Sequence, residues 1–264
     1  MRLGAALTGA PVGGGQPGRG TLADSARRLE GLGFRSLWVF DAVGRGFMLP
    51  DPLQALTAAA AVTSPETELG TGVLQLPIRN PAEVAHRAMT LRMEAGPRVL
   101  LGVGPGSTAD DFAAFASADG VDADYDDRFA RFERQLVELR GFLTAGEHDG
   151  RRLGPWPAVV GGPELYLAGW RGRWVERAAS EAAGWIASAT YADDDTLGDA
   201  IERFRRAGGR RAIVTTLRVD DDPQPAIERL HRFAAMGFDD AVVLDPAPTE
   251  ARLARIVAEV PAED

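Results

Sequence analysis

Short apolar runs alternate with longer amphipathic runs along the whole chain, which predicts strands separated by helices. The apolar runs predict eight strands, at residues 2–8, 36–40, 68–76, 98–103, 164–168, 185–189, 212–219 and 241–244. The amphipathic runs that follow predict eight helices, at residues 22–32, 52–63, 81–95, 125–144, 173–183, 196–207, 225–236 and 250–260. Eight strand–helix pairs in 264 residues favour an α/β fold, a (β/α)8 TIM barrel, as a single domain over residues 1–264. A doubly wound sheet more often stops at about six or seven strands.

Several predicted helices have typical start signals. Asp51 and Asn80 each precede a proline, so their side chains can accept helix N–H groups while proline occupies the first helical position. Thr21 and Asp24 have the spacing of a capping box. These signals support the predicted boundaries of three helices.

The composition excludes several kinds of chemistry. The chain has no cysteine and no lysine, which excludes thiolate nucleophiles, thiolate metal sites, Schiff bases and a Walker-type phosphate loop. Its three histidines, His86, His148 and His231, are too scattered to predict a metal site. The net charge of −9 argues against a nucleic-acid partner, and no apolar run approaches the roughly 20 residues that cross a membrane. The start of the chain resembles a signal peptide, but Gly4, Thr8 and Gly9 interrupt its apolar stretch, which favours a first strand and leads us to expect a cytoplasmic protein. Its expected partner is a small-molecule substrate.

Glycines are concentrated where the predicted strands end, which is where a barrel of this kind carries its active site. They are Gly13, Gly14, Gly15, Gly70, Gly72, Gly102, Gly104, Gly106, Gly169 and Gly172. A glycine has no Cβ, so backbone at these positions can approach a flat ligand closely, although turn formation alone explains many of them. Residues 104–124 and 145–163 are longer than ordinary connections, which predicts lids, binding elements or local insertions.

The segment 167–173 (LAGWRGR) combines a strand end, small residues and two arginines at the start of a helix. Free N–H groups, the helix dipole and the guanidinium groups of Arg171 and Arg173 could together bind a phosphate. The alternative is that these arginines only solvate the end of the helix.

Four acidic residues stand near strand ends or helix starts. Asp41 and Asp245 each end a strand, where a carboxylate can act as a base or, more commonly, cap a loop. Asp110 and Asp111 are most simply interpreted as charges that complement the dipole of a following helix.

Aromatic residues divide between the predicted core and the predicted site. Trp38, Phe40 and Trp185 alternate into strands and are expected to pack in the core. Trp170 follows a strand and could flank a ring-shaped ligand.

Six segments resemble the luciferase-like flavin-dependent oxidoreductases, the superfamily of bacterial luciferase and the coenzyme F420-dependent enzymes. The segments are 33–41 (GFRSLWVFD), 69–77 (LGTGVLQLP), 79–85 (RNPAEVA), 99–108 (VLLGVGPGST), 126–132 (DDRFARF) and 184–187 (GWIA). Their order and spacing together are specific. The resemblance implies a (β/α)8 barrel, in agreement with the strand count.

The resemblance also implies a cofactor, FMN or the deazaflavin F420, across the barrel mouth. A non-proline cis peptide often lies behind the ring in this family, and the matching bond joins Gly72 and Val73. By the same resemblance, Gly104, Gly106 and Ser107 line the edge of the ring. The residues expected to hold its phosphate are Gly169, Trp170, Arg171, Gly172 and Arg173, and Ala168 directly before them is also expected to bind the cofactor.

The chain departs from the family at two positions. Many members carry a histidine directly after the acid that ends the second strand, but here Ala42 follows Asp41. F420-dependent sugar phosphate dehydrogenases carry an acid after the glycines of the fourth strand, where this chain has Ser107. Both proton-transfer arrangements are therefore in doubt, and Asp41 and Ser107 are the candidates for polar contacts near the reacting centre.

The leading hypothesis is an FMN-dependent monooxygenase that uses reduced flavin and dioxygen on a small organic substrate, with a flavin reductase as a possible partner. An F420-dependent oxidoreductase that transfers hydride is the second hypothesis, and a barrel that binds flavin without turnover is the third. The resemblance also leads us to expect a homodimer. Residues 58–61 could form its contact face, or could simply pack their helix onto the barrel.

Overall fold

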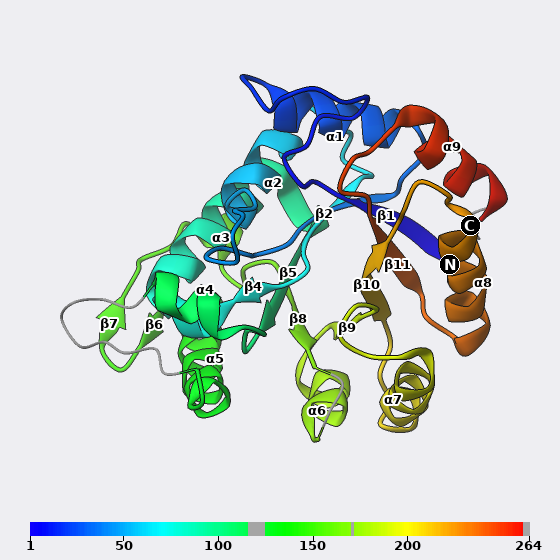
Figure 1. Cartoon of the computed structure of the whole chain (residues 1–264). Coiled ribbons are helices and arrows are strands. Elements are labelled where there is room, and N and C mark those ends of the chain that lie inside the picture. The colour runs from blue at the N-terminus through cyan, green and yellow to red at the C-terminus, as the bar shows by residue number, and fades with distance from the viewer. Residues whose placement is uncertain (116–124, 170–171, 261–264) are drawn as a thin grey trace.

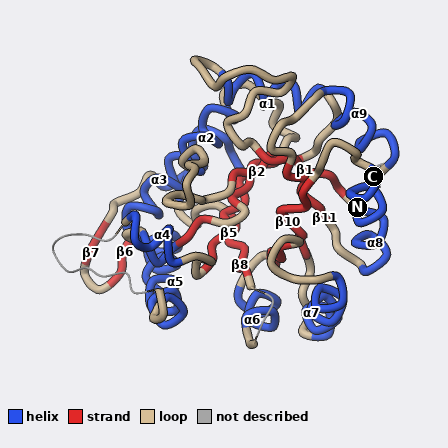
Figure 2. The backbone as a smooth tube through the Cα atoms, in the orientation of Figure 1, coloured by secondary structure: helices blue, strands red, loops and turns tan. Residues whose placement is uncertain are grey.

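Parallel strands close into a barrel with helices around its outside (Figure 1). The computed structural model describes residues 1–115, 125–169 and 172–260. Within these residues the hydrogen-bonded strand order is β3-β2-β1-β11-β10-β9-β8-β5-β4, and pairing of β3 with β5 closes the ring (Figure 2). The barrel segments are β1 (Arg2–Ala6), β2 (Ser36–Val39), β3 (Glu68–Thr71), β4 (Leu74–Gln75), β5 (Val99–Gly104), β8 (Glu164–Ala168), β9 (Gly184–Ser188), β10 (Ala212–Arg218) and β11 (Asp240–Leu244). Because β3 and β4 are successive parts of one barrel strand, the described barrel has eight strands, which confirms the predicted (β/α)8 fold.

Each barrel strand is followed by a helix that packs on the outside of the barrel. The helices are α1 (Thr21–Gly31), α2 (Pro52–Ala60), α3 (Pro81–Ala95), α5 (Arg128–Ala145), α6 (Trp174–Glu181), α7 (Asp194–Arg206), α8 (Gln224–Met236) and α9 (Glu250–Glu259). The two long segments carry extra elements, as expected. The first contains the short helix α4 (Ala109–Ala114), and the second contains the hairpin β6 (Glu147–His148) and β7 (Arg151–Arg152). In the part of the chain that the structure describes, no helix has the length and apolar character needed to cross a membrane.

The helix starts agree with the sequence at two of three positions. Asp51 accepts the Gln54 N–H at 3.0 Å, and Asn80 accepts the Ala82 N–H at 2.9 Å, so both predicted caps are confirmed. The capping box predicted for α1 is wrong, because the Thr21 hydroxyl donates to the Gly18 carbonyl instead and Gly20, in a left-handed conformation, precedes the helix. Helix α5 begins three residues later than predicted.

Trp38 fills the barrel interior, and glycines on both neighbouring strands make room for it. A Cβ at Gly70 of β3 would lie 2.5 Å from the indole ring, and one at Gly4 of β1 would lie 2.8 Å from its Nε1 atom. At Gly102 a Cβ would lie 2.1 Å from the Thr71 carbonyl oxygen. The expectation that glycines at these strand ends serve a flat ligand is therefore wrong for Gly70 and Gly102, whose missing side chains are needed for packing inside the barrel.

The predicted core aromatics divide between two layers. Trp38 and Phe40 lie in the cluster inside the barrel. Trp185 belongs to the larger core between the barrel and the helices, where its ring stacks on Phe238 at 5.7 Å between centroids. In α2, Ala59 is fully buried in this outer core, which is the packing role that the sequence left open for residues 58–61.

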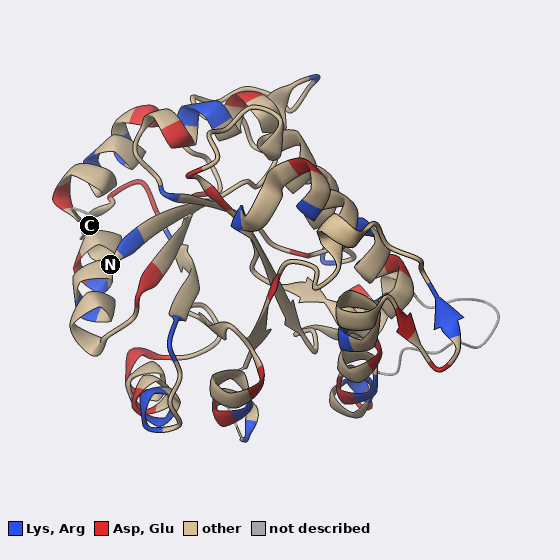
Figure 3. Ribbon diagram, turned by 180° about the vertical axis from the view of Figure 1, so that it is seen from behind, with Lys and Arg blue, Asp and Glu red and all other residues tan. Residues whose placement is uncertain are grey.

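Charged side chains close the barrel at the amino ends of its strands. Figure 3 shows charges mainly on helices and loops, with a few on the strands. Arg211 donates to both oxygens of the buried Asp240 at 2.9 Å and also pairs with Glu68. Arg2 pairs with the same Asp240 at 3.0 Å. Burial lowers the pKa of Arg211, but the bonds to Asp240 and Glu68 outweigh this and raise its pKa above the ordinary value. The network joins β10, β11, β3 and β1 across the barrel.

We expect Arg211→Met to lower the free energy of unfolding by roughly 3–5 kcal/mol, because the substitution leaves the Asp240 carboxylate buried without its bidentate partner. The matched change Arg27→Met removes an exposed pair with Asp24 and should cost less than about 1 kcal/mol. Urea unfolding followed by circular dichroism measures both. Equal losses of unfolding free energy in the two variants would show that the buried network contributes no more to stability than the exposed pair does.

Candidate active site

The carboxyl ends of the strands meet at one end of the barrel, where small side chains form an apolar floor. Val73, Gly104 and Ala168 lie against one another, since a Cβ at Gly104 would be 2.8 Å from Val73 Cγ2 and 3.3 Å from the Ala168 Cβ. Ala6 and Leu244 pack beside them over the interior aromatic cluster. All of these side chains except the glycine are only partly buried. The floor therefore offers an apolar surface that a flat ring could contact.

The backbone of the floor has an unusual bond where it was expected. The peptide between Gly72 and Val73 is cis, as the family resemblance implied. It lies between β3 and β4, the two segments in which the single predicted strand 68–76 is observed.

Asp111 organises the rim beside this floor. Its carboxylate is fully buried and accepts hydrogen bonds from the Arg45 guanidinium, the Thr108 hydroxyl at 2.8 Å, the Gln75 amide at 2.9 Å and the Val43 N–H at 3.1 Å. Burial raises the pKa of Asp111, but these hydrogen bonds outweigh it, so the pKa lies below its usual range and the carboxylate stays charged. Asp111 lies in the first turn of α4, as predicted for a charge that complements a helix dipole, but its side chain is buried and also organises the rim.

Arg45 joins loops from opposite sides of the barrel mouth. It follows β2, and its Nη1 donates to the Tyr191 hydroxyl, which follows β9, at 3.0 Å. In the ring of strands, β1, β11 and β10 separate β2 from β9 on one side, and β3, β5 and β8 separate them on the other. Arg45 also donates to the Ser107 hydroxyl at 3.2 Å, and Ser107 donates to Tyr191 at 3.2 Å. The three side chains therefore meet above the end of β5.

Asp41 is buried and fully engaged. Its carboxylate accepts from Arg79 at 2.8 and 3.2 Å and from the Gln75 N–H at 3.0 Å. Both oxygens are thus occupied, which fits the capping role considered for a strand-ending acid better than a role as a base. The Gln75 side-chain amide donates to the Asp41 backbone carbonyl and to the Asp111 carboxylate, both at 2.9 Å, while the Gln75 backbone N–H binds the Asp41 carboxylate. Gln75 therefore connects the two acidic residues.

The predicted phosphate region lies at the next strand along the rim. Gly169 and Gly172 both have positive φ angles, and α6 begins at Trp174 without a side-chain cap. Arg173 is 68% exposed and pairs with Glu133 of α5. Trp170 and Arg171 lie outside the described residues. The start of α6 could therefore accept an anion, but Glu133 would compete with that anion for the Arg173 guanidinium.

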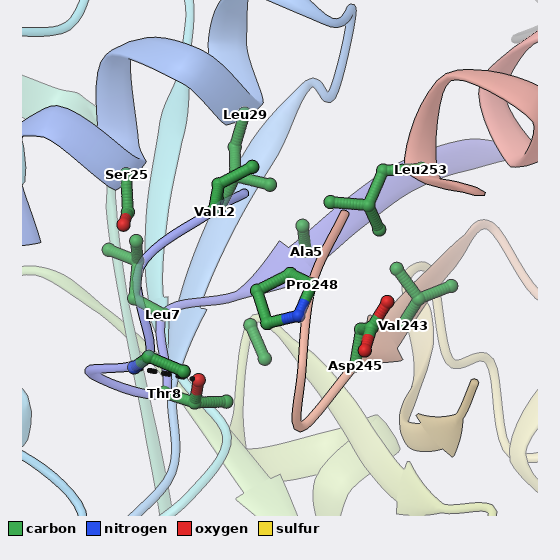
Figure 4. Close-up of a pocket in the computed structure, with 12 residues that line it drawn as sticks. Ala5, Leu7, Thr8, Val12, Ser25, Leu29, Val243, Asp245, Pro248 and Leu253 are labelled. Atoms are coloured by element: carbon green, nitrogen blue, oxygen red, sulfur yellow. Dashed lines mark hydrogen bonds between the residues drawn. The ribbon is translucent and has the colours of Figure 1, made fainter. Parts of the chain in front are cut away.

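Asp245 lies beside a small cavity between the ends of β1 and β11 (Figure 4). Its carboxylate accepts the Ala247 N–H at 3.0 Å and pairs with Arg252 at 2.7 Å, so it caps a loop. The cavity has a volume of about 10 Å³, the room of about one water molecule, and does not accommodate a cofactor.

Sequence reasoning missed four residues of the mouth. Arg45, Gln75 and Tyr191 carry the hydrogen-bond network, and Thr216 has a φ of 58° in the bulge of β10, a strained conformation for a β-branched residue. The hydroxyls of Thr216 and Ser188 lie 2.7 Å apart. Arg45 and Tyr191 follow predicted strand ends, a position that many residues share, and Gln75 and Thr216 lie within predicted strands, so no sequence signal distinguished any of the four.

Comparisons with known proteins agree on the family of this chain. A model of the luciferase-like monooxygenase family matches residues 1–263. The F420-dependent glucose-6-phosphate dehydrogenase of Kineococcus radiotolerans is 30% identical over 92% of this chain and 77% of that protein. The 4-hydroxyprotoasukamycin monooxygenase of Streptomyces nodosus subsp. asukaensis is 36% identical over 50% of this chain, which spans only 33% of that protein.

A solved structure has the same fold. The oxygenating constituent of 3,6-diketocamphane monooxygenase from Pseudomonas putida, in complex with FMN, superposes with a TM-score of 0.71. The superposition covers 98% of both chains at 16% identity. At this identity the likeness concerns the fold alone.

We expect Asp111→Asn to loosen the loop that carries Arg45, because the amide cannot replace the charged acceptor of the guanidinium. Tryptic cleavage after Arg45 should become at least about tenfold faster, which corresponds to about 1.4 kcal/mol of easier local opening. Mass spectrometry of timed digests measures the rate. The neighbouring Asp110 is exposed, so Asp110→Asn is the matched control and should leave the rate unchanged. A faster cut in both variants would contradict the assigned role of Asp111.

Proposed function

Because this chain belongs to the luciferase-like monooxygenase family, we propose that it is a flavin-dependent monooxygenase that uses reduced FMN and dioxygen on a small organic substrate. The observation that carries this proposal is the apolar floor of Val73, Gly104 and Ala168 at the carboxyl ends of the strands. The family is one of oxidoreductases, so the proposal concerns the cofactor, the oxidant and the substrate. The FMN named for the Pseudomonas putida structure supports it by analogy.

The residues at the mouth fit a tricyclic ring. Val73, Gly104 and Ala168 would lie beneath the ring with the Gly72–Val73 bond, and Gly106 and Ser107 would lie along its edge. The Gln75 Oε1 atom is buried, lies close to Gly106 and accepts no hydrogen bond from the described residues.

The phosphate would lie at the start of α6, held by N–H groups and by Arg173. Gly169 and Gly172 leave the backbone there uncovered by Cβ atoms. Glu133 pairs with Arg173 and, at 2.9 Å, with Arg177, so a bound phosphate would have to share these cations with a carboxylate.

When bound, reduced flavin supplies the electrons that activate dioxygen. The protein would contribute position and polarity: the Ser107 hydroxyl, bonded to Arg45, would lie near the reacting region, and Asp41 holds Arg79 and the Gln75 backbone. No histidine follows Asp41, because Ala42 occupies that position. This chain therefore lacks, at this position, the imidazole that could transfer a proton in relatives with the histidine.

Hydride transfer with F420 is the second candidate, favoured by the Kineococcus radiotolerans relative, which matches 92% of this chain. Under the FMN proposal a flavin reductase is the partner that supplies reduced flavin, and we propose a homodimer under either cofactor.

Titration with FMN and F420 tests the cofactor. We expect FMN to bind and to change the protein's tryptophan fluorescence saturably, and the protein with reduced FMN and dioxygen to transfer one oxygen atom to the added substrate while the other leaves as water. Reduced FMN consumes dioxygen by itself, so the measurement is oxygenated product by mass spectrometry with isotopically labelled dioxygen. Tight binding of F420 alone, with no oxygenated product, would replace the proposal with the second candidate. Binding of neither would overturn both.

We expect Arg173→Gln to weaken FMN binding about tenfold and to leave riboflavin binding unchanged, because only FMN carries the phosphate. Glu133→Gln should strengthen FMN binding about twofold to fivefold, since it removes the competing carboxylate. Arg152→Gln, in the exposed β6–β7 hairpin, is the control and should change neither affinity. Calorimetry measures all four proteins. A parallel loss of FMN and riboflavin binding in Arg173→Gln would place the phosphate elsewhere.

A further inference from the structure

We propose that the substrate is a largely apolar molecule with one hydrogen-bond-accepting oxygen, such as a ketone, and not a phosphorylated sugar. This inference rests on the proposed function, since it assigns the substrate class of the same site. Three observations carry it: exposed apolar side chains at the mouth, charges that are already paired, and a compact group of hydrogen-bonding side chains.

Large apolar side chains are exposed around the mouth. Of the nine such exposed side chains in the described part of the chain, five lie on the loops and helix ends that follow β2, β5 and β9. These five are Phe47, Met48, Phe115, Phe129 and Tyr191. Met48 is the most exposed, at 78%. Exposed apolar side chains that cluster at one functional face of a protein indicate a binding site for an apolar ligand. Single exposed apolar side chains scattered over the surface do not.

Contacts join four of these side chains, all except Phe129, to the loop that follows β2. The loop that carries Phe47 and Met48 lies against α4, since a Cβ at Gly44 would be 2.5 Å from the Asp110 carbonyl oxygen. Phe115 directly follows α4 and stacks under Arg79 at 5.9 Å. Tyr191 reaches the same loop through its bond to Arg45. Leu49, next to Met48, packs on the cluster inside the barrel, so the apolar rim is continuous with the floor.

Two arginines of this rim are already paired with buried carboxylates. Arg45 pairs with Asp111, and Arg79 pairs with Asp41 at 2.8 Å. A sugar phosphate would have to take these two cations from their partners, which would leave a buried carboxylate unpaired. Arg45 and Arg79 therefore offer little free positive charge to an anionic substrate.

The hydrogen-bonding side chains suit a single oxygen atom. Arg45, Ser107 and Tyr191 are mutually bonded at 3.0 to 3.2 Å, and Asp111 fixes the guanidinium from behind. Arg45 is only 19% exposed at its side chain, whereas Tyr191 is 43% exposed. Tyr191 is therefore the most exposed member of the group, and its ring forms part of the apolar wall.

Calorimetric binding tests the substrate class with three probes, in the presence of whichever oxidised cofactor the titration identifies. The probes are 4-phenylcyclohexanone, phenylcyclohexane and glucose 6-phosphate. We expect the ketone to bind about tenfold more tightly than the hydrocarbon, the worth of one hydrogen bond, and at least about tenfold more tightly than the sugar phosphate.

Two substitutions locate the site. Met48→Glu should weaken ketone binding at least about tenfold, because it places a charge in the apolar rim. Met93→Glu makes the same change at an exposed methionine, 48% exposed, near the far end of α3, and should have no effect. Tyr191→Phe should lower the affinity for the ketone to that for the hydrocarbon and leave the hydrocarbon affinity unchanged, which a merely structural role would not do.

Several results would overturn the inference. They are preferential binding of glucose 6-phosphate, equal effects of Met48→Glu and Met93→Glu, equal losses of both apolar ligands in Tyr191→Phe, or no binding of the ketone up to its solubility limit. If one of these results is obtained while the cofactor binds normally, the proposed substrate class is wrong and the proposed function is unaffected. Loss of cofactor binding in the wild-type protein would instead defeat the proposed function.

Discussion

The interior of a closed ring of strands must be filled by side chains, and the way this chain fills it determines where a ligand can bind. At the level of Trp38 the interior is packed so fully that both neighbouring strands carry glycine. Toward the carboxyl ends the side chains shrink to Ala6, Val73 and Ala168, and Gly104 has none. The change from a large indole to small groups along one axis leaves an apolar floor at one end and a solid core below it.

Buried carboxylates order both ends of the barrel, with different consequences. At the amino ends, Asp240 holds Arg211 and Arg2 and so ties the strands together. At the carboxyl ends, Asp111 holds Arg45 and so ties loops together instead of strands. A buried carboxylate is tolerated only when several donors satisfy it, and each of these has them. The same physical requirement thus stabilises the fold at one end and shapes the candidate site at the other.

The floor and the rim of the barrel mouth are suited to different ligands. The floor and the start of α6 present backbone and small side chains, which suits a cofactor whose own chemistry does the difficult step. The rim above presents apolar side chains and hydroxyls on loops, and loops vary more freely than the strands that carry them. A family with one barrel and several chemistries is expected from this construction, because changes in the rim need not disturb the core.

The sequence by itself determined the fold, because the alternation of apolar and amphipathic runs is a local property of each segment and parallel strands with intervening helices have few ways to close. It also determined the caps at Asp51 and Asn80, and through the family resemblance it identified the Gly72–Val73 bond. Only the tertiary structure decided the rim. Asp111 and Arg45 are 66 positions apart, and each resembles an ordinary surface charge until folding buries one against the other. Likewise Gly70 and Gly102 could not be told from ligand-facing glycines, since the atoms that need their space come from other strands.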